Sequence, residues 1–383
     1  MKKSVLFLLM FMFLFSLNID VKAETFEFDL SDDTDLFLQM YEDYNVDELI
    51  DNTPNGAKKV LDDFEISPND PFSFSKLFSD EGFEYLKDFI LSSITSPLAI
   101  TGVILVTIIV CALCASMTDN NLQSNHSLNT IATLSVISVL ILPINSILNS
   151  VVDTVFAITV FMGIFIPIFA GILIAALKSS TATVYSSVMF FTCEAITYSC
   201  KNYVLPFTNC FIALSVSSGI SGSVRLDGII RIVKKFAYII IGVAMSIFLA
   251  VLSIQGVVSS ATDNVASKTA KFFISSFVPI IGPSISESLG SLKACISLLK
   301  SSVGIYAVIA ILITILPLLI STFIYKLSLT LCADIAEMFF VDSIKNVLTA
   351  LNQALSLILA VLLCVSIMFI FSITIMSVAG GSS

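Results

Sequence analysis

The sequence predicts an all-α fold: a polytopic transmembrane helical bundle with a small acidic extracytoplasmic helical segment at its N-terminus. Of the 383 residues, 56% are hydrophobic and only 13% are charged. The apolar residues form runs of roughly 18 or more, which a soluble core does not require. The formal net charge is -10, and most of the acidic residues lie near the start of the chain. These three observations separate an acidic soluble piece from a membrane body.

Residues 1–23 have the pattern of a signal peptide. Lys2 and Lys3 precede an apolar stretch at 5–17, and Val21-Lys22-Ala23 is a small-residue cleavage pattern. We expect the mature protein to begin near Glu24, outside the cytoplasm. An uncleaved membrane anchor is the alternative.

Residues 24–96 are predicted to form the acidic extracytoplasmic segment. Its apolar residues recur at helical spacing in two groups: Leu36, Phe37, Met40, Tyr41 and Tyr44, then Val46, Leu49 and Ile50. Turns are predicted at 52–56 and 68–71. Because so small and charged a segment buries little apolar surface, its order is expected to depend on a partner or on the membrane body. Its acidic surface is either a solvated face or a site for a basic partner.

Residues 97–383 form the predicted membrane domain, with about seven spans. Residues 182–219 are ambiguous, since Glu194, Lys201 and Asn202 interrupt the hydropathy: they hold two short spans, or one span and a surface segment. Residues 327–351 place their polar side chains on one broad side and predict an amphipathic helix. The remaining spans are expected at 97–116, 128–147 with Pro143, 155–177 with Pro167, 236–258, 303–325 and 354–378.

The densest basic cluster of the chain lies between residues 219 and 235. It consists of Arg225, Arg231, Lys234 and Lys235. Because cytoplasmic loops of membrane proteins carry an excess of Lys and Arg, this loop is expected on the cytoplasmic side.

Residues 272–292 depart from a series of simple spans. They are apolar enough to enter a bilayer, but Pro279, Gly282 and Pro283 would break a helix. We therefore expect a broken or re-entrant segment, covered by neighbouring helices. A tight hairpin between two ordinary spans is the alternative.

No catalytic constellation, cofactor-binding motif or metal site is predicted. Cys111 and Cys114 have redox-motif spacing, but they lie inside an apolar span, where a thiol is inert. The remaining candidates are carboxylates in or beside apolar runs, because a carboxylate at depth is costly unless it is protonated, paired or solvated. Glu194 is the better placed of these; Glu287 and Asp153 are expected near the interface.

Several short segments, taken in order, resemble a known family. They are Asn45-Val46-Asp47-Glu48-Leu49-Ile50, Phe277-Val278-Pro279-Ile280-Ile281-Gly282, the run ILPLLISTFIYKLS at 315–328 and the Gly-rich end. In this order they are similar to the stage III sporulation protein AE family. The resemblance implies a sporulation protein in the mother-cell membrane surrounding the forespore. It also implies partners: other stage III sporulation membrane proteins in a transenvelope, secretion-like channel complex. The lipid bilayer is a further partner, and no nucleic acid is expected.

The leading hypothesis is a non-enzymatic membrane subunit of that complex, required for endospore formation. The alternative is a secondary transporter or permease for a small solute, in which broken helices and intramembrane carboxylates are expected features. A membrane-embedded enzyme is a third possibility, which the lack of a His, Asp or Ser constellation disfavours.

Overall fold

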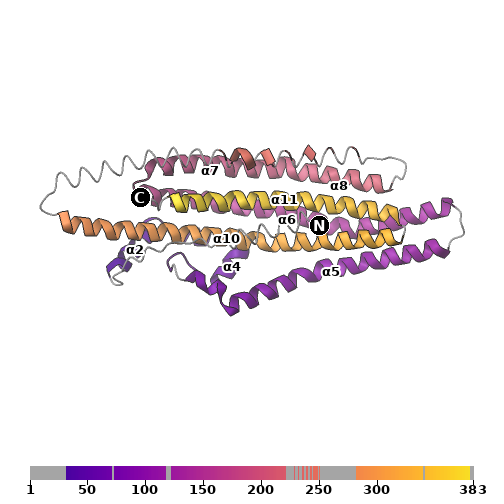
Figure 1. Cartoon of the computed structure of the whole chain (residues 1–383), viewed down its shortest axis with the longest axis horizontal. Coiled ribbons are helices and arrows are strands. Elements are labelled where there is room, and N and C mark those ends of the chain that lie inside the picture. The colour runs from indigo at the N-terminus through magenta and orange to yellow at the C-terminus, as the bar shows by residue number, and fades with distance from the viewer. Residues whose placement is uncertain are drawn as a thin grey trace.

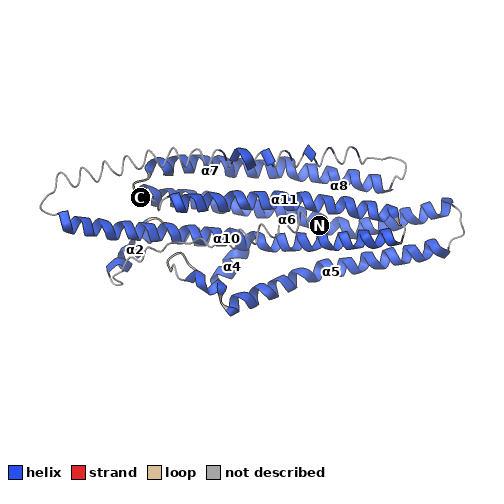
Figure 2. Ribbon diagram, viewed as in Figure 1, coloured by secondary structure: helices blue, strands red, loops and turns tan. Residues whose placement is uncertain are grey.

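A computed structural model describes residues 32–70, 73–117, 122–220, 282–339 and 341–379, with scattered residues between 228 and 250. The predicted signal peptide, residues 1–23, lies outside this part of the chain. All the regular structure in the described residues is helical (Figure 2). The long helices lie side by side along one axis, and the short N-terminal helices lie against the flank of α10 (Figure 1).

The acidic segment contains the two short helices that its hydrophobic spacing predicts, α2 (Asp32–Asp43) and α3 (Val46–Asp51). A further helix, α4 (Asn55–Asp63), and a 3-10 turn, η1 (Ser73–Phe78), follow them. The predicted turn at 52–56 separates α3 from α4, because Pro54 precedes the first residue of α4 and stands in an extended conformation.

Two helices follow, α5 (Asp80–Met117) and α6 (Leu122–Ala175). The expected domain boundary at residue 96 falls inside α5. The expectation of separate spans at 128–147 and 155–177 is wrong, because one continuous helix, α6, includes both together with Pro143 and Pro167. The intervening residues 148–154 contain neither Gly nor Pro, so nothing in them ends the helix.

The ambiguous stretch at 182–219 forms two helices that continue in one direction. Helix α7 (Ser179–Ser199) passes through a π-helical stretch, η2 (Cys200–Val204), into α8 (Leu205–Ile220). Figure 1 shows α7 and α8 in line, so the chain does not reverse at Tyr198 to Tyr203. The turn before α7 is tight: Leu177 has a positive φ of 60°, and the Lys178 amide donates to the Leu173 carbonyl.

The last two helices form an antiparallel pair, α10 (Gly282–Met338) and α11 (Asp342–Ala379). The predicted amphipathic helix at 327–351 is wrong, because the chain turns between Met338 and Asp342. Its polar residues belong to the end of one helix and the start of the next. Lys345 of α11 pairs with Glu337 of α10 at 2.7 Å across this turn.

The break expected at 272–292 is only partly within the described residues. From Gly282 the chain is helical, so residues 282–292 contain no break. Pro283 is the second residue of α10, where proline fits a helix because the first-turn amides have no helical partner. Pro279 lies outside the described residues.

Four helices in the described part of the chain are long and apolar enough to cross a membrane. Their apolar windows are Ile94–Cys114, Thr130–Ala175, Leu292–Met338 and Asp342–Thr374. The chain thus has the make-up of a multi-pass membrane protein. In the window of α11, 61% of the residues are buried, against 22% in that of α5. Helix α11 is therefore central and α5 peripheral.

Hydroxyl side chains do not interrupt these apolar helices because they bond to their own backbone. Thr101 donates to the Pro97 carbonyl at 2.7 Å, and Ser366 donates to the Leu362 carbonyl at 2.6 Å. Such bonds to the residue four positions earlier satisfy the hydroxyl within the helix. The high Ser and Thr content is therefore compatible with a lipid-facing bundle.

Candidate functional site

The residues singled out in the sequence do not come together in one site. Gly282, Pro283 and Glu287 lie in the first turns of α10. Glu194 lies on α7, where it is exposed, as is Asp153 on α6. An exposed carboxylate on an outer helix face is not part of a buried ion pathway. The structure therefore gives these residues no shared chemistry.

The most specific polar contacts in the described residues join the acidic segment to the bundle. The hydroxyls of Thr53 and Tyr306 lie 2.9 Å apart, and both residues are buried. The Thr53 hydroxyl also donates to the Leu49 carbonyl at 2.9 Å. Nearby, the Ser302 hydroxyl donates to the Pro68 carbonyl. We call this contact, formed by Thr53 and Pro68 with Ser302 and Tyr306, the docking site.

Apolar packing surrounds the docking site. The ring of Tyr44 lies so close to Gly171 of α6 that a Cβ at that position would be 3.0 Å from a ring carbon. Leu49 and Ala57 are fully buried and belong to one continuous core with α10 and α11. The acidic segment thus packs against the membrane body, which is one of the two supports that its composition predicts.

The opposite face of the acidic segment carries its charge. Exposed carboxylates stand on α2, α3, α4 and the following turn: Asp35, Glu42, Asp43, Asp47, Glu48, Asp51, Asp62, Asp63, Glu65 and Asp70. Two of them form ion pairs, Asp51 with Lys58 at 3.2 Å and Glu65 with Lys76 at 3.0 Å. These pairs are exposed and contribute little to stability. The segment therefore presents an acidic surface away from the bundle.

One buried charge at the docking site was not anticipated from the sequence. Lys300 lies two residues before Ser302 and about one helical turn before Gly304 on α10, and it is 3% exposed. It is within electrostatic range of Lys178, in the turn between α6 and α7. The sequence signal was available, because an apolar run begins at Val303, just after Lys300 and two serines.

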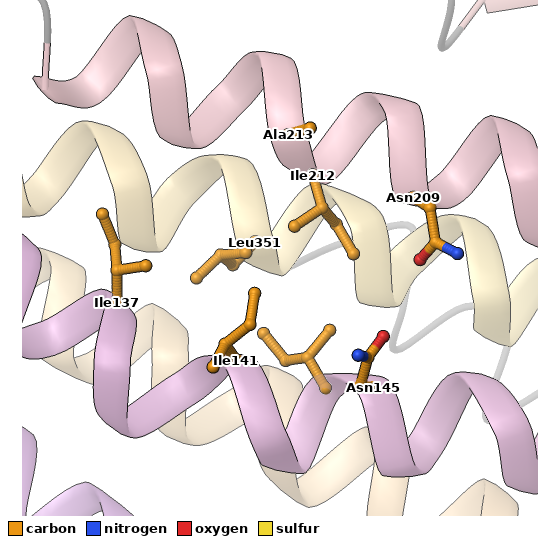
Figure 3. Close-up of a pocket in the computed structure, with 8 residues that line it drawn as sticks. Ile137, Ile141, Asn145, Asn209, Ile212, Ala213 and Leu351 are labelled. Carbon is orange, nitrogen blue, oxygen red and sulfur yellow. The ribbon is translucent and has the colours of Figure 1, made fainter.

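A groove of about 280 Å³ lies between α6, α8 and α11. Ile137, Ile141, Ile144, Ile212, Ala213 and Leu351 form its apolar lining. Asn145 of α6 and Asn209 of α8 are its polar residues, and Figure 3 shows their amides at one end of it. No Asp, Glu, Lys, Arg or His lines it. Neither asparagine was predicted from the sequence, where only ionisable residues in apolar runs stand out as candidates.

Cysteine offers no further site in this part of the chain. None of the eight cysteines forms a disulfide, and no cluster of three His, Cys, Asp or Glu residues that could hold a metal occurs among the described residues. The arrangement is that of a helical scaffold with a docked acidic segment and a neutral groove.

Comparison with known proteins decides the family. The family model of stage III sporulation protein AE matches residues 68–380, which is most of the chain. The chain belongs to the stage III sporulation protein AE family. Membership implies a role in sporulation. The match contains the Pro68 end of the docking site and all of the long helices, whereas α2, α3 and α4 precede it.

A curated relative agrees with this assignment. Stage III sporulation protein AE of Bacillus subtilis (strain 168) is 27% identical over 249 residues. The aligned region spans 63% of this chain and 61% of the relative's length. No solved structure matches the chain.

Proposed function

We propose that the protein is a non-enzymatic integral membrane subunit of a sporulation transenvelope channel complex linking mother cell and forespore, required for endospore formation. The family match over residues 68–380 carries this proposal. The protein would lie in the mother-cell membrane surrounding the forespore, with other stage III sporulation membrane proteins as partners.

The distribution of surface in the described residues supports a subunit over a catalyst. Hydroxyl side chains of the long helices donate hydrogen bonds to the backbone of their own helix. The best-defined polar contact, between Thr53 and Tyr306, holds the acidic segment against the bundle. What the protein offers to partners is the acidic surface of α2, α3 and α4 and the apolar outer faces of the long helices. Both are association surfaces rather than reaction sites.

A secondary transporter remains the second candidate, because a groove with two amides between three helices resembles a solute site. Proton or ion coupling requires a titratable or charged group at such a site. Glu194, the best carboxylate candidate, is exposed on α7 and does not line the groove. This arrangement favours the subunit over the transporter.

Co-purification from sporulating cells tests the proposal. A tagged chain should capture other stage III sporulation membrane proteins, and its deletion should stop sporulation after engulfment. Gly282→Leu places a large side chain at the start of α10 and is expected to reduce partner capture while the protein stays in the membrane. Glu194→Gln, at an exposed position, is the matched control and should capture partners normally.

The transporter hypothesis makes the opposite prediction. Partner capture would survive Gly282→Leu, and Glu194→Gln would abolish solute flux in vesicles containing the purified protein. Capture of no sporulation protein by the wild-type chain, together with normal sporulation of the deletion strain, would contradict the proposed function.

A further inference from the structure

The two longest helices exceed the thickness of a bilayer. Helix α10 has 57 residues and α6 has 54. At 1.5 Å per residue these helices are about 86 Å and 81 Å long, whereas the hydrocarbon core is about 30 Å thick. Because the helices run side by side along one axis (Figure 1), a bilayer can surround only part of the bundle.

Contacts between the helices divide the bundle into two halves along this axis. On the N-terminal side of the midpoint of α10, Gly304 lies beside Phe169 and Ser377, and Tyr306 contacts Thr53. We call this the docking half. On the C-terminal side, Tyr325 contacts Ser96 of α5 at 3.0 Å. We call this the α5 half. Tyr306 and Tyr325 are separated by 19 residues of one helix, or about 28 Å, which is nearly a full hydrocarbon thickness.

Both halves are apolar along their helices, so hydropathy alone does not place the bilayer. Between Ser301 and Tyr325, α10 has no charged residue. In the α5 half, charged residues are absent from α5 after Asp88, from α6 before Asp153 and from all of α8.

The position of the acidic segment indicates which half of the bundle the bilayer surrounds. The segment lies along the flank of the docking half, and its carboxylates, including Glu42, Asp43 and Asp62, are exposed. A bilayer around the docking half would bring these carboxylates to hydrocarbon depth, where an unpaired charge is strongly disfavoured. Lys178, Lys293 and Lys300 also lie in this half.

The α5 half has the surface that lipid requires. Like the docking half, where Phe191 is 77% exposed, it carries large apolar side chains at high exposure, among them Val106 at 60% and Leu142 at 74%. The part of α10 that lies in this half has charged residues only at its start and at its end. Lys326 is next to Tyr325, while Asp334 and Glu337 lie within two turns of the chain reversal, where Glu337 pairs with Lys345.

A belt of aromatic and charged residues separates the two halves. Tyr198 and Tyr203 are about half exposed, and their rings lie 5.8 Å apart. Thr197 bonds to Thr159, so Lys201 and Asp153 each lie within about 9 Å of that pair along the axis. Tyrosine and lysine are typical of the level where hydrocarbon meets headgroups. The π-helical turn of η2 falls at this level.

We infer that the bilayer surrounds only the α5 half, with its boundary at the belt formed by Asp153, Tyr198, Lys201 and Tyr203. The docking half projects from the membrane as a continuous helical extension, flanked by the acidic segment. This placement goes beyond the proposed function and holds whichever complex the protein joins.

Tryptophan fluorescence tests the placement directly, because the chain contains no Trp. Single substitutions at exposed residues report on each half: Phe207→Trp and Leu142→Trp in the α5 half, Phe191→Trp and Phe371→Trp in the docking half. Each full-length variant is reconstituted into phosphatidylcholine vesicles with and without brominated acyl chains. Brominated chains should quench the first pair at least about twofold more than the second, because only the first pair lies within the hydrocarbon core.

Two variants in each half keep the result interpretable if one substitution disturbs folding, which size-exclusion chromatography detects. Quenching of Phe191→Trp and Phe371→Trp as strong as that of Phe207→Trp would overturn the inference, since the bilayer would then surround both halves. Stronger quenching of the docking-half pair would overturn it as well.

Discussion

At the scale of single residues, one hydroxyl pair ties the acidic segment to the bundle. Thr53 and Tyr306 share a buried hydrogen bond of 2.9 Å. Thr53→Val keeps the shape of the side chain but leaves the Tyr306 hydroxyl without this partner. We expect a loss of about 1–3 kcal/mol in the free energy of unfolding, because a buried polar group then lacks a hydrogen bond. Unfolding of the purified protein in mild detergent measures it.

A double-mutant cycle with Tyr306→Phe separates this bond from other effects. The double variant should lose less than the sum of the single losses, by about 1 kcal/mol, because both singles break the same bond. Additive losses would mean that the two hydroxyls do not interact in the protein.

Tyr41 should make the acidic segment sensitive to alkaline pH. It is 4% exposed, and its hydroxyl donates to a carboxylate oxygen of Asp47 at 2.9 Å. Burial, and then this hydrogen bond, raise the pKa of Tyr41 well above its ordinary value of 10.0. The folded protein therefore retains a proton that the unfolded chain releases near pH 10, so stability is full below about pH 10 and falls above it.

The expected result is a thermal midpoint that declines above about pH 10, with a smaller decline in Tyr41→Phe, because that variant has no phenol to titrate at this position. The difference between the two curves isolates Tyr41 from the other tyrosines and the lysines. Parallel curves would show that Tyr41 does not contribute.

At the scale of elements, two glycines of α6 provide a matched pair. A Cβ at Gly171 would lie 3.0 Å from a carbon of the Tyr44 ring, whereas a Cβ at Gly163 would have nothing within 4 Å. Gly171→Leu should therefore push Tyr44 away and loosen the acidic segment, at about 1–3 kcal/mol. Gly163→Ala should be neutral or stabilising by up to about 1 kcal/mol, because alanine favours a helix.

Proteolysis at acidic residues measures this difference. The acidic segment of Gly171→Leu should be cleaved faster than that of the wild type, and that of Gly163→Ala no faster. Equal cleavage of the two variants would mean that the Tyr44 contact does not hold the segment in place.

At the scale of elements, the sequence predicted helices correctly but misplaced several helix boundaries. Hydrophobic spacing predicted α2 and α3, and hydropathy predicted the apolar character of the long helices. Hydropathy was less reliable for the helix boundaries. It divided α6 because two proline-containing runs look like two spans, although residues 148–154 hold no Gly or Pro. It joined α10 to α11 because the reversal at 339–341 also lacks both residues.

The docking site was beyond sequence reasoning for a different physical reason. Thr53 and Tyr306 are 253 positions apart, and neither is unusual in its local sequence. Their contact depends on how the acidic segment folds back along α10. The candidates that sequence could offer, such as Glu194 and Gly282, were chosen by local composition, and the structure gives them no common site.

At the scale of the whole molecule, the structure has two fewer chain reversals before the basic cluster than the sequence predicts, and the two differences cancel in the predicted membrane side. The sequence predicts two spans at 128–177 and allows two more at 182–219. The structure has one continuous helix, α6, in the first region and helices in line, α7 and α8, in the second. Each correction removes one reversal, so the side expected for the basic cluster at 225–235 is unchanged.

The last prediction follows from this parity. The end of α5, the end of α8 and the reversal between α10 and α11 lie toward the same end of the bundle (Figure 1). Arg225, Arg231, Lys234 and Lys235 follow α8 in sequence and are costly to translocate, so this end should be cytoplasmic. Reporters fused after Lys235 and after Met117 should both be active in the cytoplasm. A reporter fused at Asn52, between α3 and α4, should be extracytoplasmic. Opposite sides for the first two fusions would contradict the continuity of α6, α7 and α8, because an odd number of additional crossings would then separate them.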